Sequence, residues 1–432
     1  MSTESPEDII NALEFCVIDL ETTGGNHSKD KIIEVGMVKL SGTKVIGEKN
    51  FLINPQTQIP EFIQRLTGIS QKDVKDAPVI EDVIEEILEF IADDIIVAHN
   101  TSFDVPFLNG ILKKLGKSEL SNRVICTNVM TKHLIPDILN SNLNYMSRLF
   151  KIEHSKAHRA HDDALATAKL LTNYLDIFKE KGIKKINQLY YPRNKFELDR
   201  THFDNTTHSN DDVVKMVKNQ NCSLLFTVKG ERGLILAVIP IEKPAEEFEF
   251  VKHILSKLDW KMVTIKLLKP LLEGFFQFNN HFLKYPEDIR NEILNYLENR
   301  YKILKPEQTL DQIDFIIAHH LIEDQVMAYS FLNLNTNAKS LFKIPAQKKK
   351  LLQYLVNQVN RFESQQKGRK KHLLHKELVP LIESFLQKKK EEQKYLYLFR
   401  KDFKEAPEKT LTIIENYVQN YQNDSNFPIS HL

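Results

Sequence analysis

Hydrophobic and polar residues near the N-terminus alternate in short runs that are typical of β-strands. Three apolar runs at residues 14–20, 32–40 and 44–53 are separated by short polar stretches and predict a three-stranded meander. Residues 79–91 carry apolar side chains at helical spacing with acids between them, and residues 95–99 form another short apolar run. This order predicts strands, then a helix and a further strand.

Helical spacing dominates the next part of the chain. Residues 103–115, 143–150 and 160–178 predict three more helices. Strands followed by helices that alternate with short strands are typical of a layered fold. We therefore expect residues 1–185 to form an α/β domain.

A different pattern follows a polar stretch, and we expect a linker at residues 186–212. Beyond it, residues 224–241 predict a hairpin and residues 247–258 a helix, and MVTIKLL predicts another strand. From Pro286 onward nearly all of the pattern is helical. The expected second domain, residues 213–432, is a mostly helical α+β region of unknown role.

The composition is that of a globular protein large enough for two or three domains. The chain has 432 residues, of which 42% are hydrophobic, and no apolar run approaches the length of a membrane span. The first residues are polar and acidic, unlike a secretory signal, so we expect a cytoplasmic location with no membrane partner. Three scattered cysteines predict neither a disulfide framework nor a zinc finger.

Charge is distributed unevenly along the chain. Residues 1–185 contain 22 Lys and Arg against 27 Asp and Glu, whereas the remainder contains 37 against 31. Residues 343–404 alone contain 17 basic and 6 acidic residues, including the run KGRKK. Such a segment could bind the phosphate backbone of a nucleic acid. Apolar residues at helical spacing support an equally simple interpretation, in which the charges lie on solvated helix faces.

Two carboxylates interrupt the first apolar strand. Asp19 and Glu21 are two residues apart, so a strand places them on the same face, whereas Leu20 points into apolar packing. Two carboxylates so close repel one another unless a cation lies between them. Carboxylate oxygens suit Mg²⁺ or Mn²⁺, and the pair therefore predicts a divalent metal site.

Further acidic residues are expected to converge on this face. Asp104 follows a strand and a turn, and Asp163 follows a loop that carries His158. Both aspartates lie near the predicted N-terminus of a helix, where a fixed carboxylate is favoured. His158 and Asp163 are five residues apart, so imidazole and carboxylate could meet around one water molecule.

Three phrases carry a resemblance to a known family. DLETTG at residues 19–24, HNTSFD at 99–104 and HRAHDDA at 158–164 resemble the exonuclease motifs of the DEDDh, or DnaQ-like, 3′-5′ exonucleases. The flanking phrases KIIEVGMVKL, FLINP, RLTGIS and KDAP resemble the exonuclease of bacterial replicative polymerases, both the proofreading epsilon subunit and the domain inside the Gram-positive polymerase. The resemblance covers about residues 12–178.

The resemblance implies a ribonuclease H-like mixed sheet with flanking helices. It implies two Mg²⁺ or Mn²⁺ ions, His158 as general base, and the metal ligands Asp19, Glu21, Asp104 and Asp163. Candidates to hold the terminal nucleotide are Thr22, Thr23, His99, Asn100 and Phe103. The histidines at 154 and 161 do not fit the motif, so we do not expect a zinc site.

The resulting hypothesis is a metal-dependent 3′-5′ exonuclease that acts on a single-stranded 3′ end. The flanking phrases favour DNA, in proofreading or repair, with a polymerase or repair protein as partner. An RNA-trimming exoribonuclease is an alternative, because no motif reveals a contact to the 2′-hydroxyl. A protein that binds nucleic-acid ends without cutting them is another.

Overall fold

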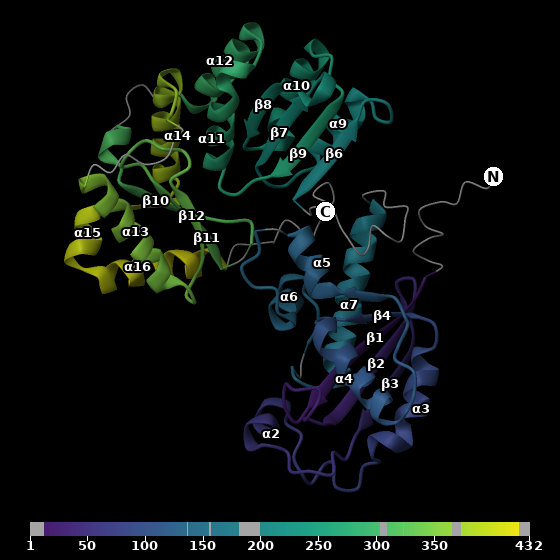
Figure 1. Ribbon diagram of the computed structural model, residues 1–432. Coiled ribbons are helices and arrows are strands. Elements are labelled where there is room, and N and C mark those ends of the chain that lie inside the picture. Colours follow the sequence, from purple (N-terminus) through teal and green to yellow (C-terminus); the bar gives the residue numbers. More distant parts are fainter. Residues whose placement is uncertain are drawn as a thin grey trace. The chain divides into compact units, whose positions relative to one another are not determined.

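The chain divides along its sequence, between Leu198 and Asp199, into two compact units, called here the N-terminal and C-terminal units (Figure 1). The computed structural model describes residues 13–135, 137–154, 157–180, 199–302, 309–322, 324–364 and 373–422. Among these residues, no helix combines the length and the apolar character that crossing a bilayer requires.

The N-terminal unit contains one five-stranded mixed sheet in the order β3-β2-β1-β4-β5. Strands β1, β2 and β3 are antiparallel neighbours, whereas β4 runs parallel to β1 and β5 runs parallel to β4. This arrangement confirms the predicted ribonuclease H-like α/β fold. The elements are β1 (Glu14–Thr22), β2 (Ile32–Ser41), β3 (Lys44–Leu52), α2 (Glu61–Thr67), α3 (Ile80–Ile91), β4 (Ile95–Ala98), α4 (Thr101–Lys114), β5 (Val124–Cys126), α5 (Thr127–Leu134), α6 (Leu143–Leu149) and α7 (Ala160–Glu180).

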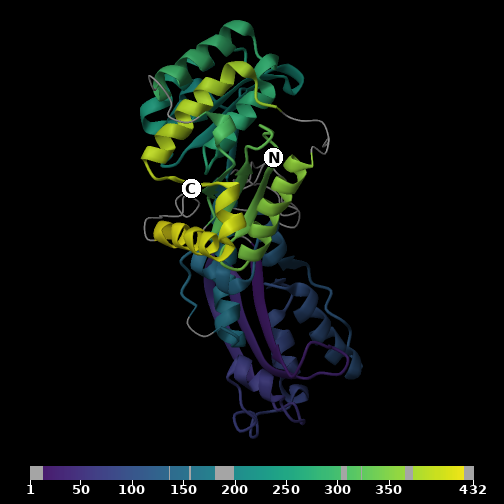
Figure 2. The ribbon, with the colours of Figure 1, turned by 90° about the vertical axis from the view of Figure 1, so that its left-hand side faces the viewer.

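Helices cover both faces of this sheet. Figure 2 shows the purple strands between α7 and the blue helices α3 and α4. Alternate residues of β1, Cys16, Ile18 and Leu20, are buried against apolar side chains of α3 and α4. The other face of β1 and β2 lies against α7. Because β1 is central, its C-terminal end is enclosed by helices that start from several parts of the chain.

Gly36 allows α7 to approach the sheet closely. It lies on β2 directly opposite Asp19 of β1. A Cβ atom built at this position would lie 2.2 Å from the backbone carbonyl carbon and oxygen of Ala160 and 2.4 Å from the backbone nitrogen of His161. Only a residue without a side chain therefore lets the first turn of α7 contact the strands here.

We expect Gly36→Ala to lower the free energy of unfolding by about 3 kcal/mol or more, because the atoms it meets are backbone and cannot rotate away. The matched control is Gly25→Ala, where nothing lies within 4 Å of the added Cβ. Hydrogen–deuterium exchange of the β1–β2 peptides, together with thermal unfolding, measures the effect. Equal stability of the two variants would show that α7 does not approach β2 as closely as described.

The C-terminal unit contains two four-stranded antiparallel sheets, in the orders β6-β9-β7-β8 and β12-β11-β10-β13. Helices α13, α15 and α16 share an apolar core with the second sheet. The helices are α9 (Asn210–Lys218), α10 (Pro244–Lys257), α11 (Leu272–His281), α12 (Glu287–Tyr301), α13 (Lys348–Glu363), α14 (Val379–Glu391), α15 (Arg400–Glu405) and α16 (Pro407–Gln422). The strands are β6 (Arg200–Asp204), β7 (Leu224–Lys229), β8 (Ile235–Ile241), β9 (Met262–Leu267), β10 (Phe315–His319), β11 (Gln325–Ser330), β12 (Lys339–Lys343) and β13 (Tyr395–Leu398).

The second sheet corrects the expectation of helix nearly throughout from Pro286. Four segments of that region are strands, and each is only four to six residues long. All five residues of β10 are buried, so its sequence shows no alternation of polar and apolar positions. A short, wholly apolar run does not distinguish a buried strand from part of a buried helix.

The polar stretch assigned to the linker also contains a strand. Residues Arg200–Asp204 form β6, which pairs with β9 at the edge of the first sheet. Phe203 is the one buried residue of this strand. An edge strand with a single buried side chain lacks the apolar run by which sequence analysis detects strands.

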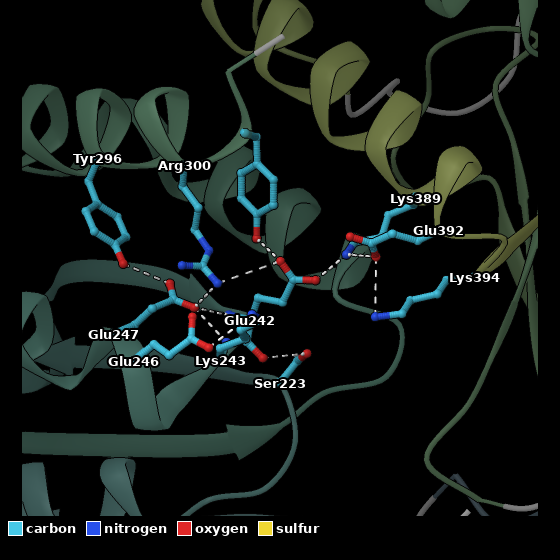
Figure 3. A network of polar contacts seen from close by, with 11 residues as sticks. Ser223, Glu242, Lys243, Glu246, Glu247, Tyr296, Arg300, Lys389, Glu392 and Lys394 are labelled. Atoms are coloured by element: carbon cyan, nitrogen blue, oxygen red, sulfur yellow. Dashed lines mark hydrogen bonds and ion pairs between the residues drawn. The ribbon is translucent and has the colours of Figure 1, made fainter. Parts of the chain in front are cut away.

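A buried ionic network connects the end of β8 with α10, α12 and α14 (Figure 3). The Lys389 side chain is 3% exposed and forms ion pairs with Glu242 and Glu392. Glu242 also accepts a hydrogen bond from the Tyr301 hydroxyl at 2.9 Å. Arg300 pairs with Glu247 at 2.9 Å. Burial opposes the ionisation of Glu242, but its contacts with Lys389 and Tyr301 outweigh burial and lower its pKa. At Glu247 burial outweighs the contacts and raises the pKa.

This network changes the interpretation of the basic segment. Lys389 is buried, and Lys348 and Lys404 pair with Glu415 and Glu363 at 2.8 and 2.6 Å. The run KGRKK lies outside the described residues. Each of these three lysines has an acidic partner within the fold, and Lys389 is buried, which neither the phosphate-binding nor the solvated-face interpretation predicted.

We expect Lys389→Met to lower the free energy of unfolding of the C-terminal unit by about 3–5 kcal/mol, because it leaves buried Glu242 without its cation. Lys349→Met, at an exposed position of α13, serves as the control and should change it by less than about 0.5 kcal/mol. The single tryptophan, Trp260, is 6% exposed within this unit, so its fluorescence in urea reports the transition. Equal effects of the two substitutions would mean that the buried pair contributes nothing.

Candidate active site

Strand β1 places Asp19 and Glu21 on one face, as the two-residue spacing predicted. Leu20 between them is 4% exposed and lies in the core against α3 and α4. Glu21 pairs across the sheet with Glu34 of β2, and the pairing shifts by one residue after Glu21. The strand thus presents two carboxylates where its regular ladder ends.

Asp104 reaches the same strand from the first turn of α4. Its side chain is 3% exposed, and its Oδ1 accepts a hydrogen bond from the backbone N–H of Leu20 at 3.2 Å. This bond joins residues that are 84 positions apart and fixes the start of α4 beside β1. Asp104 is therefore next to the Asp19–Glu21 pair, as sequence analysis expected.

Asp163 and His158 come from the start of α7 and the loop before it. The backbone N–H of His158 donates to Asp163 Oδ2 at 3.2 Å. Among the described residues, Glu21, His158 and Asp163 form a group whose potential ligand atoms all lie within 4.8 Å of one another. The structure thus brings three of the five expected catalytic residues to one point.

Burial raises the pKa values of three carboxyl groups at this site, and repulsion between carboxylates adds to the shift for two of them. Burial, with Asp104, Asp163, Glu21 and Glu34 as further causes, holds the pKa of Asp19 well above its usual value. Burial and then Asp163 raise the pKa of Glu21 to about 8, although Arg159 acts in the opposite direction. Burial raises the pKa of Asp104 to about 7. A divalent cation would relieve this repulsion, so the residues present fit the metal centre that the resemblance implied.

Glu34 and Arg159 support the site and were not identified from the sequence. The Glu34 side chain is fully buried and accepts two hydrogen bonds from Arg159, at 2.8 and 3.1 Å. It also accepts the backbone N–H of Ala160 at 2.9 Å, which anchors the first residue of α7. Burial opposes ionisation, but these bonds and one from Asn50 outweigh it and lower the Glu34 pKa. The available signal was the same as for Asp19: an acid within a buried strand.

His154 was also missed as a site residue. Its Nε2 lies 2.5 Å from Asp163 Oδ1, and its side chain is 5% exposed. The sequence offered no periodicity or motif that would distinguish His154 from a surface histidine.

Thr22 and Thr23 shape the turn that follows β1. The Thr22 hydroxyl donates to the backbone carbonyl of Gly24 at 2.6 Å, and the Thr23 hydroxyl accepts the backbone N–H of Lys31 at 3.0 Å. Both side chains are buried at 6% exposure. A contact between either threonine and a nucleotide stays a prediction.

The other three candidates for nucleotide binding lie at the end of β4 and the start of α4. His99 Nε2 donates to the Ser141 carbonyl at 2.8 Å, so its Nδ1 accepts from the Thr127 hydroxyl at 3.0 Å. Burial lowers the His99 pKa, which favours this neutral ring. Asn100 accepts a hydrogen bond from the Ser102 hydroxyl, and Phe103 packs against Phe107 with ring centroids 4.9 Å apart. Their contacts with substrate likewise stay predictions.

Known proteins are similar in sequence to the N-terminal unit. Residues 16–171 match the family model described as Exonuclease, RNase_T. The chain is 40% identical over 176 residues to the DNA polymerase III PolC-type of Caldanaerobacter subterraneus subsp. tengcongensis and 42% identical over 176 residues to that of Bacillus subtilis. The matches cover 41% and 40% of this chain and 12% of each relative, so the chain spans about an eighth of their length.

A solved structure of Exonuclease X in complex with 5′ overhanging duplex DNA is 26% identical and covers 41% of this chain and 97% of that one, with a TM-score of 0.34. The family model and the sequence relatives confirm the predicted resemblance of the N-terminal unit to DnaQ-like exonucleases. This unit is similar in sequence to a segment of PolC-type DNA polymerases III.

We expect the metal-free protein to lose stability as the pH rises from about 5 to about 8. Glu21 and Asp104 have raised pKa values in the folded protein, so they bind protons more tightly when folded than when unfolded throughout that interval. Binding of Mg²⁺ or Mn²⁺ to the ionised groups should restore stability, with a larger gain at pH 8 than at pH 6. Thermal unfolding at both pH values, with chelator or with metal, measures this.

Asp19→Asn is the matched variant for this measurement. It removes one buried charge, so it should raise the metal-free midpoint at pH 8 and reduce the gain on adding metal. A metal-free midpoint that is the same at pH 6 and pH 8 in the unmodified protein would contradict the described repulsion.

Proposed function

We propose that this protein is a metal-dependent 3′-5′ exonuclease that hydrolyses the terminal phosphodiester bond of a nucleic acid. The observation that carries the proposal is the group of Glu21, His158 and Asp163, whose ligand atoms lie within 4.8 Å of one another beside two buried aspartates. This supplies acidic ligands and an imidazole at one point, which hydrolysis by an activated water molecule requires.

Each residue has a distinct role in the proposed reaction. Asp19, Glu21, Asp104 and Asp163 would hold two Mg²⁺ or Mn²⁺ ions, which would supply Lewis-acid activation of water and stabilisation of the leaving oxygen. His158, which is exposed to solvent, accepts the proton of the attacking water. Thr22, Thr23, His99, Asn100 and Phe103 surround the terminal nucleotide, with Phe103 packing on its base or sugar.

DNA is the proposed substrate, and proofreading or repair the proposed setting. Support comes from the relatives, which are named as PolC-type DNA polymerases III. A polymerase or repair protein would then be the partner that presents the 3′ end. An RNA substrate is the second candidate, and the same assay distinguishes the two.

The test is digestion of single-stranded DNA and RNA labelled at the 5′ end, with Mg²⁺ or Mn²⁺. We expect the DNA to shorten stepwise from its 3′ end. Asp19→Asn should reduce the rate at least about a hundredfold, because it removes an acidic metal ligand. Asp93→Asn, which changes an exposed aspartate, should leave the rate unchanged.

Three other outcomes would contradict the proposal in different ways. Shortening of RNA alone would make the protein an exoribonuclease. Cleavage that survives both chelator and Asp19→Asn would exclude the proposed centre. Tight binding of both strands without cleavage would support a protein that binds nucleic-acid ends.

A further inference from the structure

A histidine outside the recognised motifs contacts a proposed metal ligand. His154 lies in the segment between α6 and α7, and its Nε2 is 2.5 Å from Asp163 Oδ1. The other oxygen of Asp163 accepts the backbone N–H of His158 at 3.2 Å. Both oxygens of this carboxylate are therefore held by the segment that precedes α7.

The surroundings of His154 indicate which nitrogen carries the proton. The side chains of His154 and Asp163 are 5% and 13% exposed. His154 Nδ1 is buried and has no hydrogen-bond partner among the described residues. An ionised carboxylate only accepts hydrogen bonds, so the Nε2–H of His154 donates to Asp163. The polar contact of this ring is therefore made by Nε2. Burying the Nδ1 atom without a partner among the described residues costs free energy.

The bond still leaves Asp163 able to bind a metal ion. Each carboxylate oxygen has two lone pairs, and each of the two hydrogen bonds uses one of them. A ligand whose orientation is fixed by a neighbouring hydrogen bond binds metal more tightly than one that rotates freely. The direction that matters here is toward Glu21 and His158, whose ligand atoms lie within 4.8 Å of those of Asp163.

We propose that His154 is a positioning residue of the metal centre: it donates a hydrogen bond from Nε2 to Asp163 and holds that carboxylate toward Glu21 and His158. This inference rests on the proposed function, because it assumes that Asp163 binds metal. His154 does not itself belong to the group of close ligand atoms found among the described residues, so its action is through Asp163.

The structure offers a matched pair for comparison. His161, at the start of α7, also contacts a carboxylate, with its Nε2 3.0 Å from Glu48 Oε2. That pair is 30% and 40% exposed and lies outside the proposed site. Replacing His161 therefore removes the same kind of contact without touching Asp163.

The experiment compares His154→Leu, His154→Gln, His161→Leu and Asp163→Asn in the full chain. Mn²⁺ binding is measured by the electron paramagnetic resonance signal of free Mn²⁺, and folding is measured by thermal unfolding in chelator. Leu keeps the apolar volume without a donor, whereas the Gln amide can place a donor near the position of Nε2. We expect His154→Leu to weaken Mn²⁺ binding about 10–100-fold, the usual effect of losing such a partner. His154→Gln should retain most of the affinity, and His161→Leu all of it.

A second readout separates positioning from packing. Nuclease activity of His154→Leu should recover as the Mn²⁺ concentration is raised, because only the affinity for metal is reduced. Equal loss of Mn²⁺ affinity in the Leu and Gln variants, with an equal fall in the unfolding midpoint, would overturn the proposal in favour of core packing.

The Asp163→Asn variant tests the proposed metal centre separately from the role of His154. If it weakens Mn²⁺ binding while His154→Leu does not, the inference about His154 is wrong and the proposed metal centre stands. If Asp163→Asn itself leaves Mn²⁺ binding unchanged, the metal centre of the proposed function is wrong, and the role of His154 falls with it.

Discussion

The N-terminal unit depends on one electrostatic constraint, the burial of several carboxylates against one another at the end of β1. Burial raises the pKa values of Asp19, Glu21 and Asp104, and repulsion from neighbouring carboxylates adds to this effect at Asp19 and Glu21. These three acids and the neighbouring Asp163 come from three separate segments, β1, α4 and α7. The fold must therefore hold the three segments together although their carboxylates repel one another. The apolar layers around β1 provide the opposing free energy, because Leu20 and its neighbours are packed between the sheet and α3 and α4.

One fully buried acid in the same unit has the opposite character. Glu34 receives two bonds from Arg159 and one from the backbone of Ala160, so its charge is neutralised and its pKa is lowered. The contrast separates two uses of buried acid in neighbouring strands. Glu34 fixes the start of α7 to β2, whereas Asp19 and Glu21 are left with an excess of negative charge. By fixing α7 to β2, Glu34 also fixes the position of Asp163 of α7 relative to Asp19 and Glu21.

Local patterns predicted most of the N-terminal unit, because β1, β2, β3, α3, α4 and α7 are each nine or more residues long with regular apolar positions. They missed α2, β5 and α5, which have only three to eight residues. The sequence motifs also indicated Asp19, Glu21, Asp104, Asp163 and His158 as candidates. Each motif contains both the polar residues and the adjoining end of a strand or start of a helix, so it could be recognised locally. Glu34, Arg159 and His154 could not be found in that way, because their partners are distant in sequence or lack any repeated spacing. Glu34 and Arg159 illustrate this, with hydrogen bonds across 125 positions.

The C-terminal unit was harder to predict from sequence because its strands are short. Its second sheet is made of strands of only four to six residues, and β10 is buried along its whole length, so little periodicity is left to detect. Lysines 348, 389 and 404 resembled a surface for phosphate groups in sequence, yet each has an acidic partner within the fold. Charge along a sequence therefore overstated the charge available at the surface.

The backbone of His158 has a consequence for how this domain can change over time. Its φ angle is 64°, in the left-handed region that side chains other than glycine rarely adopt. Holding a histidine there costs free energy that a glycine would not cost. Random substitution and selection for thermal stability alone would favour loss of this imidazole. A lineage under such selection would reach a more stable protein that has lost its proposed general base.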